Sequence, residues 1–293
     1  MIKRIFFCAA IILSGTAFAE SSWNNSITAQ SLFGEYSGSV KRDSIVSGGV
    51  IFSGDYLDSG GITIGINHSN VKFNLGYGDI SQNSLYLSGR YNIFSDSISG
   101  KVILRSDLHY IDNDDPTQDT DQVKAFAPQA TYVPYSGAYA INFGFAYSSF
   151  QNNLSVYQYT PGFGFGFNDK KDWLSVGAYL IYPDNTLRSQ GRLTTRAIEL
   201  NLTHWLTGER ILPISFLTAN VMLGERIYAV DNNAGAVYNL ANVQKSSFSV
   251  GSSWDLGNSY SMMTIIGQEN FEDVDISNSY SNRYLYFNLS KSW

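Results

Sequence analysis

The feature that most constrains the fold of this chain is a strict alternation of apolar and polar residues. Ile62, Ile64 and Ile66, for example, are separated by Thr63 and Gly65. Successive side chains of a β-strand point to opposite faces, so each such segment predicts a strand with one apolar face. The same alternation recurs in residues 71–78, 84–94, 101–111, 138–149, 198–203 and 247–256. We therefore expect an all-β protein.

The chemistry of the polar faces indicates which solvent the apolar faces meet. In a soluble sheet the polar face is rich in Lys, Glu and Asp, whereas here it is mostly Ser, Asn, Gly, Thr, Ala and Tyr. Charged residues make up only 15% of the chain, against about 25% in soluble domains. Small neutral side chains suit a confined interior lined by water. The apolar faces are therefore expected to point outward into lipid.

A sheet that spans a membrane has to close on itself, because hydrocarbon offers no partners for free N–H and C=O groups. Membrane barrels also carry aromatic girdles at their interfaces. Aromatic residues lie near the predicted strand ends at Tyr110, Tyr132, Tyr147, Trp173, Tyr182, Trp205, Trp254 and Trp293. We predict a single closed antiparallel transmembrane β-barrel, with a secreted soluble β-protein as the alternative.

The N-terminal segment, residues 1–19, has the pattern of a secretory signal peptide. Two cations, Lys3 and Arg4, precede a short apolar run, and the segment closes on an A-x-A pattern that ends at Ala19. The run is too short to span a bilayer as a helix, which needs about 20 residues. Cleavage near Ala19 would also remove Cys8, the only cysteine. We therefore expect a secreted mature chain without disulfides.

The charge balance bears on possible partners. Acidic residues outnumber Lys and Arg by 25 to 19 across the whole chain. An acidic protein repels the phosphate backbone, so no nucleic-acid partner is expected. No motif in the sequence requires a cofactor, and none is predicted.

The last segment of the chain alternates up to its terminal residue. Leu285, Phe287, Leu289 and Trp293 all fall on one face. This pattern resembles the C-terminal strand of Gram-negative outer-membrane β-barrel proteins, although Lys291 occupies a position that is usually apolar. The resemblance implies a location in the outer membrane, contact with its lipids and lipopolysaccharide, and recognition of the strand ending at Trp293 by the barrel-assembly machinery.

The predicted topology has about fourteen strands, with twelve to sixteen possible. They are expected at 45–57, 61–68, 71–78, 84–94, 101–111, 123–134, 138–149, 154–167, 173–182, 194–206, 213–226, 245–256, 259–271 and 281–293. Residues 45–293 are assigned to the barrel, and residues 20–44 are left open between a first strand and an arm. Bacterial barrels have even strand numbers, short periplasmic turns and longer extracellular loops. Short turns are therefore expected inside at 168–172 and 257–258, and longer links outside at 112–122, 183–193, 227–244 and 272–280.

Several charged or titratable residues are predicted to line the lumen, because the alternation places them opposite the apolar faces. Their side chains would form an electrostatic constriction that selects solutes by charge, as rings of charged side chains do in pores. Alternatively, they would form ion pairs that brace the barrel wall. The predicted lumen-lining residues are Lys72, Arg90, Lys101, Arg105, Asp107, His109 and Glu199.

Asp107 and His109 also form an Asp-x-His pair on one strand face. A His oriented by a carboxylate can act as a general base, and barrel proteases of the omptin type hold such a pair near the outer end of a strand. Any lumenal strand with two polar residues would give the same pattern, and no second strand with a paired Asp-x-Asp face accompanies it. No catalytic residues are therefore predicted, and an omptin-like hydrolase is kept as an alternative.

A cluster of aspartates occupies one predicted outer loop. Dense carboxylates are candidate Ca²⁺ ligands, although the spacing is not that of an EF-hand and the segment contains no glycine. A solvated acidic loop without metal is the preferred interpretation. The five residues are Asp112, Asp114, Asp115, Asp119 and Asp121.

The segment GFGFGF, residues 162–167, has glycine at every second position. It therefore fails the G-x-G-x-x-G spacing of a dinucleotide-binding loop. A strand with its phenylalanines towards lipid and its glycines towards the lumen is the simpler interpretation. A wall without side chains would let an inward-folded loop or the N-terminal arm pack against it.

Together these features predict an outer-membrane barrel that is not an enzyme and acts as a passive, porin-like channel for small hydrophilic solutes. The alternatives are the hydrolase that uses Asp107 and His109, and a non-conducting structural or adhesion barrel. Strand number alone does not decide whether the lumen is open, because fourteen strands lie between the small filled barrels and the large porins.

Overall fold

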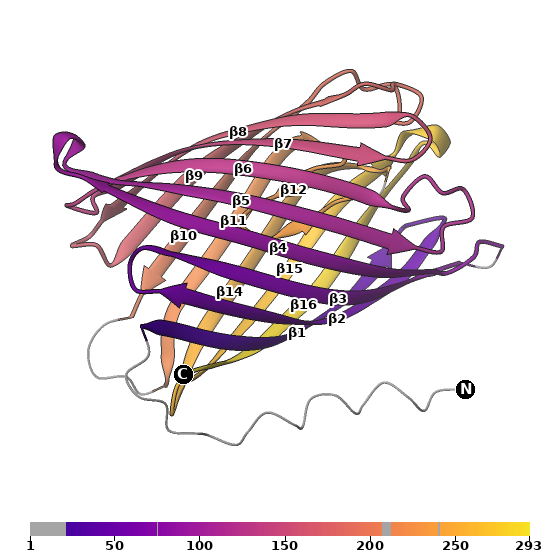
Figure 1. Ribbon diagram of the computed structural model, residues 1–293. Coiled ribbons are helices and arrows are strands. Elements are labelled where there is room, and N and C mark those ends of the chain that lie inside the picture. Colours follow the sequence, from indigo (N-terminus) through magenta and orange to yellow (C-terminus); the bar gives the residue numbers. More distant parts are fainter. Residues whose placement is uncertain (1–21, 75, 207–211, 240) are drawn as a thin grey trace.

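The alternating segments form long antiparallel strands that close into one barrel (Figure 1). The computed structural model describes residues 22–74, 76–206, 212–239 and 241–293. Within these residues, fourteen strands follow one another around the barrel in chain order, and the first pairs with the last. The predicted fold class and strand number are confirmed. No helix in the described ranges is long and apolar enough to cross a membrane.

Links join the fourteen barrel strands and form a rim at each end of the barrel. Their bounds are β1 (Trp23–Ser37), β2 (Arg42–Tyr56), β3 (Gly60–Phe73), β4 (Ile80–Ser95), β5 (Gly100–Asn113), β6 (Val123–Pro134), β7 (Tyr139–Phe150), β8 (Leu154–Phe167), β9 (Asp172–Pro183), β10 (Thr195–Trp205), β11 (Ile214–Arg226), β14 (Val243–Gly257), β15 (Tyr260–Asp273) and β16 (Asn278–Ser292). Two short 3-10 helices, η1 (Asp96–Ile98) and η2 (Val274–Ile276), lie in links.

Closure of the barrel rests on the two ends of the chain. β1 pairs with both β2 and β16, and Asn25 and Trp293 exchange backbone hydrogen bonds of 2.9 and 3.0 Å. The segment left open between an arm and a strand therefore contains a full barrel strand, and the barrel begins at Trp23 and not at residue 45. The predicted signal peptide, residues 1–19, lies outside the described residues.

One pair of predicted strands is corrected. Segments 61–68 and 71–78 form a single strand, β3, and the chain leaves the sheet after Phe73. The polar run from His68 to Asn70 looks like a turn in the sequence, but it stays in the sheet because its side chains find cross-strand partners. Ser69 donates to the Ser47 hydroxyl at 2.9 Å, for example. The barrel therefore has fourteen strands as expected, but β1 is one of them and residues 61–78 contribute one strand instead of two.

The two faces of the sheet follow the predicted alternation. On β16, Leu285, Phe287 and Leu289 point outward with 43, 37 and 38% of their surface exposed. The intervening Tyr286 and Asn288 point inward, where the Tyr286 hydroxyl donates to Gln30 of β1 at 3.0 Å. The apolar faces of the strands thus form the outside of the cylinder.

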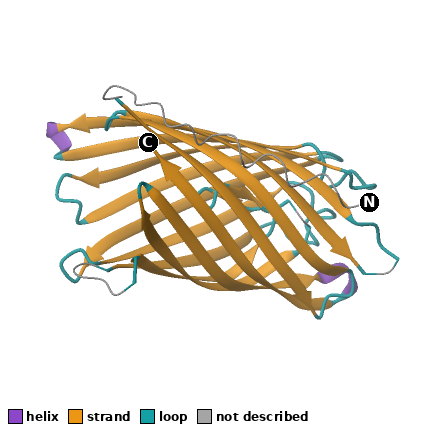
Figure 2. Ribbon diagram, turned by 90° about the horizontal axis from the view of Figure 1, so that it is seen from below, coloured by secondary structure: helices purple, strands orange, loops and turns teal. Residues whose placement is uncertain are grey.

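The links divide between two rims, which Figure 2 shows at opposite ends of the tilted strands. We call the rim that carries Trp23 and Trp293 the inner rim, and the opposite one the outer rim. The short turns predicted at 168–172 and 257–258 lie at the inner rim, where the structure has the links 168–171 and 258–259. The links predicted at 112–122, 183–193, 227–244 and 272–280 start and end at the outer rim. The longest links, 184–194 and 227–242, are at the outer rim as predicted, but the outer links 151–153 and 274–277 are as short as the inner turns.

One outer link departs from the prediction, because it folds into the barrel. This segment, residues 227–242, connects β11 to β14 and is called the inward loop below; its residue 240 lies outside the described residues. It contains a small hairpin of β12 (Val230–Asp231) and β13 (Ala236–Val237). The Asp231 carboxylate accepts two backbone N–H groups of the hairpin turn, each at 3.0 Å, and Gly235 adopts a positive φ of 61° there.

Candidate functional site: the inward loop and the chamber beneath it

The inward loop has its own hydrophobic core against the barrel wall. Ile227, Tyr228, Ala229 and Val230 expose between 0 and 1% of their surface. The ring of Tyr228 packs against that of Phe150 with centroids 4.8 Å apart. Apolar side chains on the inward positions of the outer strand halves complete this core, and they include Ile111, Val123, Leu154, Val156 and Ile181. Burial of these groups holds the loop inside the lumen.

A buried glutamine fastens the hairpin to the wall. The Gln158 side chain on β8 donates from Nε2 to the Val230 carbonyl at 2.7 Å and accepts the Val230 N–H at 3.0 Å. Only 2% of Gln158 is exposed. Its amide therefore replaces the hydrogen bonds that a neighbouring strand would give to this part of the loop, which satisfies the rule that buried backbone groups are paired.

Arg105 on β5, three strands away from β8 in the barrel, holds the tip of the loop. Its Nη2 donates to the Asn232 carbonyl at 2.7 Å and to the Tyr86 hydroxyl at 2.8 Å. The guanidinium also forms an ion pair with Asp107, at 2.8 Å between Nη2 and Oδ2 and 2.9 Å between Nε and Oδ1. Because the Asp107 side chain is fully buried, the pair is a fixed anchor for the loop.

Further contacts connect the inward loop to other strands of the barrel wall. Arg226, at the end of β11, stacks over the Tyr238 ring at 4.5 Å and the Tyr179 ring at 5.1 Å. Asn239 donates to Gln82 of β4 at 2.7 Å, and the Tyr238 hydroxyl donates to Glu269 of β15 at 3.4 Å. The loop is thus tied to strands on several sides of the lumen and lies across it.

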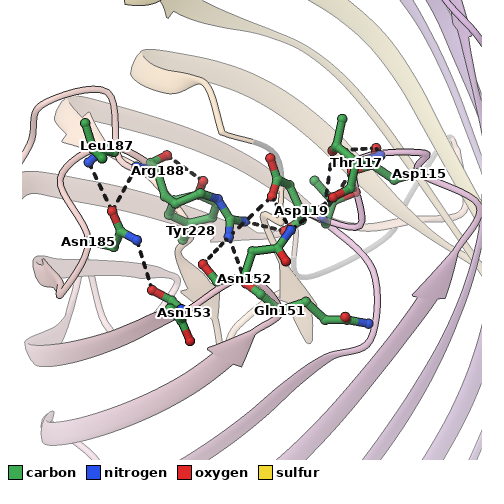
Figure 3. A network of polar contacts seen from close by, with 11 residues as sticks. Asp115, Thr117, Asp119, Gln151, Asn152, Asn153, Asn185, Leu187, Arg188 and Tyr228 are labelled. Carbon is green, nitrogen blue, oxygen red and sulfur yellow. Dashed lines mark hydrogen bonds and ion pairs between the residues drawn. The ribbon is translucent and has the colours of Figure 1, made fainter.

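Three outer links, 114–122, 151–153 and 184–194, contact one another beside the inward loop (Figure 3). We call these three links the lid. Arg188 donates to the carbonyls of Gln151, Asn152 and Asp119 at 2.7, 3.2 and 2.6 Å. Tyr228 of the inward loop donates from its hydroxyl to the Arg188 carbonyl at 2.8 Å. Burial raises the pKa of the Tyr228 hydroxyl to about 12. It therefore keeps the proton that this contact needs at neutral pH.

Below the loop, towards the inner rim, the lumen holds a polar chamber of about 300 Å³. The wall contributes amide and hydroxyl side chains from β6 to β10, and the loop contributes Asn232 and Asn233. The only carboxylate in the lining is that of Glu199, whose oxygens accept from the Tyr179 hydroxyl at 2.7 Å and Asn220 at 2.5 Å. The neutral polar groups of the wall are Gln129, Thr131, Asn142, Thr160, Ser175 and Asn201.

The glycines of the GFGFGF segment lie on the lumenal side as expected and Gly164 lines the chamber, but neither predicted occupant covers them. A Cβ at Gly164 would lie 2.9 Å from the Trp173 indole, and a Cβ at Gly162 would meet the Asn142 side chain. The glycines therefore make room for the Trp173 ring on the lumenal side of the wall. Trp173, expected from the sequence in an interfacial girdle, forms part of the chamber instead.

The predicted lumen-lining residues occupy separate places and do not meet in one ring. Arg105, Asp107 and His109 lie beside the inward loop, and Glu199 lies in the chamber. Near the inner rim, Arg90 pairs with Asp55 at 2.8 Å, with both side chains more than 40% exposed. The Lys101 ammonium lies 5.8 Å from the centre of the Phe94 ring, also near the inner rim.

Lys72 is a correction, because it points outward. Within the single strand β3 it shares its parity with Ile62, Ile64 and Ile66, which lie on the outer surface. The neighbouring Val71 points inward and is only 6% exposed. The expected inward position of Lys72 came from treating residues 71–78 as a separate strand.

Asp107 and His109 do not form the orienting pair of a general base in the structure. The Asp107 carboxylate is held by Arg105, and the His109 ring lies against that of Tyr86 with centroids 5.0 Å apart. His109 Nε2 is buried with no hydrogen-bond partner. This arrangement supports anchoring of the loop and gives no support to proton transfer.

Three of the five aspartates of the predicted acidic loop bind the protein's own backbone, whereas Asp119 contacts the side chains of Asn152 and Arg188 and Asp112 lies within β5. Asp115 accepts N–H groups of Thr117 and Thr120 at 2.9 and 3.1 Å. Burial acts to raise the pKa of the Asp115 carboxyl, but hydrogen bonds from these threonines outweigh it and lower that pKa. Asp114 and Asp121 likewise cap the backbone of strands. No three His, Cys, Asp or Glu side chains converge as a metal site among the described residues.

Arg105 and Asp107 were expected in the lumen, but the other residues that fix the loop were not singled out from the sequence. Gln158 and Arg226 each occupy one inward position in an ordinary strand pattern, so nothing distinguishes them before the fold is known. The loop itself carried a usable signal. Its sequence from Ile227 to Val230 is apolar, with Val237 and Tyr238 further on, whereas a loop in water is mostly polar.

Comparison with protein-family models gives no match, and comparison with curated proteins gives none either. Solved structures of low sequence identity are similar. The toluene transporter TodX of Pseudomonas putida has a TM-score of 0.58 at 9% identity, over 94% of this chain and 90% of that one. A bacterial polysaccharide outer membrane secretin has 0.57 at 11% identity, over 92% and 98%. Omp33 of Acinetobacter baumannii has 0.47 at 5% identity, over 92% and 99%.

TodX and the polysaccharide secretin share the barrel fold of this chain, in agreement with the resemblance of the C-terminal strand to outer-membrane barrel proteins. At such identities the likeness concerns the fold alone. The chain therefore has the closed-barrel architecture of outer-membrane proteins, and its activity has to be argued from its own lumen.

Proposed function

We propose that the chain is an outer-membrane channel for small hydrophilic solutes whose outer entrance is closed by the inward loop. The observation that carries this proposal is the change in the lumen along its axis. Apolar packing around the loop fills the outer half, whereas a polar chamber of about 300 Å³ lies below it. A barrel built only as a scaffold has no need of a polar cavity behind an inward-folded loop.

The outer surface supports a location in the outer membrane, where the lipids and lipopolysaccharide would meet the outward apolar side chains. Ile62, Ile64 and Ile66 expose 48, 44 and 60% of their surface, for example. The alternating face of β16 that ends at Trp293 supports recognition by the barrel-assembly machinery. The proposal therefore includes two kinds of partner, the outer-membrane lipids with lipopolysaccharide and the barrel-assembly machinery.

Unpaired polar atoms beside the inward loop support its movement. Asn232 Oδ1 and His109 Nε2 are buried without hydrogen-bond partners among the described residues. An unsatisfied buried polar group costs about 1–3 kcal/mol. These costs oppose the apolar packing of the loop, so its inward position is held by a smaller net free energy than its buried surface alone suggests.

Planar-bilayer recordings of the purified protein test the proposal. We expect rare, short openings from the wild type. We expect long-lived conducting steps from a variant in which residues 229–239 are replaced by a short Gly-Ser turn. The lid contact between Tyr228 and Arg188 is lost when the loop can no longer pack inward, so shortening the loop removes the closure and leaves the barrel strands unchanged. Absence of conducting steps from both folded proteins would overturn the channel proposal.

A further inference from the structure

The chamber has two kinds of wall, and this bears on what it can bind. Most of its lining belongs to fixed strands, but Asn232 and Asn233 belong to the inward loop. A ligand in the chamber would therefore touch both the barrel and the proposed gate. The inference developed here rests on the proposed channel function and names the class of solute that the same lumen recognises.

The lining favours a neutral ligand that makes many hydrogen bonds. Its polar groups are chiefly the amides of Gln129, Asn142 and Asn201 and the hydroxyls of Thr131 and Thr160. Amides and hydroxyls donate and accept equally well, so they match a solute with several hydroxyl groups. The one carboxylate, Glu199, already accepts a hydrogen bond on each oxygen. No cationic side chain is among the lining residues, so the chamber offers nothing to neutralise an anion.

Trp173 adds an aromatic surface to this polar lining. Its indole lies over the glycine wall, 2.9 Å from the position of a Cβ on Gly164 and 3.5 Å from one on Gly166. A side chain at Gly164 would displace the ring, whereas the distance at Gly166 is that of an ordinary contact. Sugar rings carry hydroxyl groups at their edges and C–H groups on their faces, so they combine hydrogen bonding with packing on an aromatic ring. Ligand sites commonly pair an aromatic surface with a few polar groups in this way.

We propose that the chamber binds a neutral polyhydroxylated solute of the size of a mono- or disaccharide. Trp173 packs against one face of the solute, and the wall amides and hydroxyls bind its edge. The volume of about 300 Å³ is at the lower end of ligand sites, which favours a small solute. Because Asn232 and Asn233 complete the site only when the loop is inward, the bound solute stabilises the closed arrangement.

Calorimetric titration of the detergent-solubilised wild type tests the binding without requiring conduction. The probes are glucose and sucrose, with glucuronate and glucosamine as charged analogues. We expect saturable binding of a neutral sugar at millimolar concentrations. We expect at least tenfold weaker binding to Trp173→Ala and an intermediate loss for Trp173→Phe, which keeps an aromatic ring. Trp23→Ala is the matched control, because Trp23 lies at the same end of the barrel, shares the outward parity of Phe33 on β1 and exposes 42% of its surface.

A second measurement tests the coupling to the loop. Addition of the same sugar should lower the open probability of the wild type in planar bilayers, and it should have no effect on that of Trp173→Ala or of the loop-shortened variant. No binding of glucose or sucrose by a folded, conducting wild type would overturn this inference and leave the channel proposal standing. Tighter binding of either charged analogue would also overturn it. Sugar binding by a protein that never conducts would overturn only the channel proposal.

Discussion

The contact between Gln158 and Val230 provides a direct way to weaken the inward position of the loop. Gln158→Met keeps the length and much of the volume of the side chain but removes both hydrogen bonds to Val230. In the inward position, the Val230 N–H and C=O groups are then buried without partners, whereas water satisfies them when the loop leaves. Each unpaired group costs about 1–3 kcal/mol, so the loss is about 2–6 kcal/mol.

Even the lower value is large for an equilibrium between two positions of a loop. About 2 kcal/mol changes the ratio of inward to outward loop about thirtyfold. We expect the open probability of Gln158→Met in planar bilayers to rise by at least that factor. This holds as long as the open probability is well below one, because it is then proportional to the ratio of outward to inward loop. The conductance of a single open step should be unchanged, because the barrel wall is the same.

The matched control is Gln30→Met. Gln30 also points into the lumen, but it accepts from the Tyr286 hydroxyl of β16 at 3.0 Å and so bridges two wall strands. Its replacement should leave the open probability within about threefold of the wild type. An unchanged open probability of folded Gln158→Met would refute the argument that these two hydrogen bonds hold the loop inside.

Two further predictions concern the other anchors of the loop. The pKa of Tyr228 is raised from 10.0 to about 12, so its neutral form stabilises the inward position fully below pH 10, and this contribution is lost as the pH rises towards 12. Open probability should rise over this interval in the wild type, and the part due to Tyr228 should be missing from Tyr228→Phe; identical pH profiles would contradict it. Asp107→Asn removes the carboxylate that pairs with Arg105 beside Asn232, which should cost about 1–3 kcal/mol and raise the open probability. Arg90→Gln, which breaks the ion pair near the inner rim, should not raise it, and an equal effect of the two changes would show that the loop is not involved.

The period of two was sufficient to predict the barrel and the orientation of most side chains. Every position of a strand alternates, so Leu285, Phe287 and Leu289 could be placed outward, and Arg105 inward, without knowledge of the pairing. The same rule failed for Lys72, because a slip in where a strand ends reverses the face of all later residues. The hydrogen bonds of His68 to Asn70 that keep β3 continuous depend on neighbouring strands and are not visible in the sequence.

The candidate site could be predicted only in part. Arg105 and Glu199 were expected in the lumen, but the partner of Arg105, Asn232, comes from a segment far away in the chain, and the contact of Glu199 with Tyr179 depends on the pairing of β9 with β10. The inward loop was expected at the outer rim because long links usually lie there. Whether such a link folds inward depends on the apolar inner wall formed by strands β5 to β9, and that wall exists only after the barrel has closed.

Accessibility of the inward loop from outside the cell tests the central claim most directly. The only natural cysteine is Cys8 in the predicted signal peptide, so one introduced cysteine would be the only thiol in the mature chain. Leu187→Cys lies on the lid with the native side chain 91% exposed, and Ala234→Cys lies at the turn of the loop hairpin. We expect a maleimide on polyethylene glycol, too large to pass the barrel, to label Leu187→Cys rapidly on intact Gram-negative cells. Ala234→Cys should label slowly and become fast when Gln158→Met is added; equally fast labelling of both single cysteines would contradict a closed inward loop.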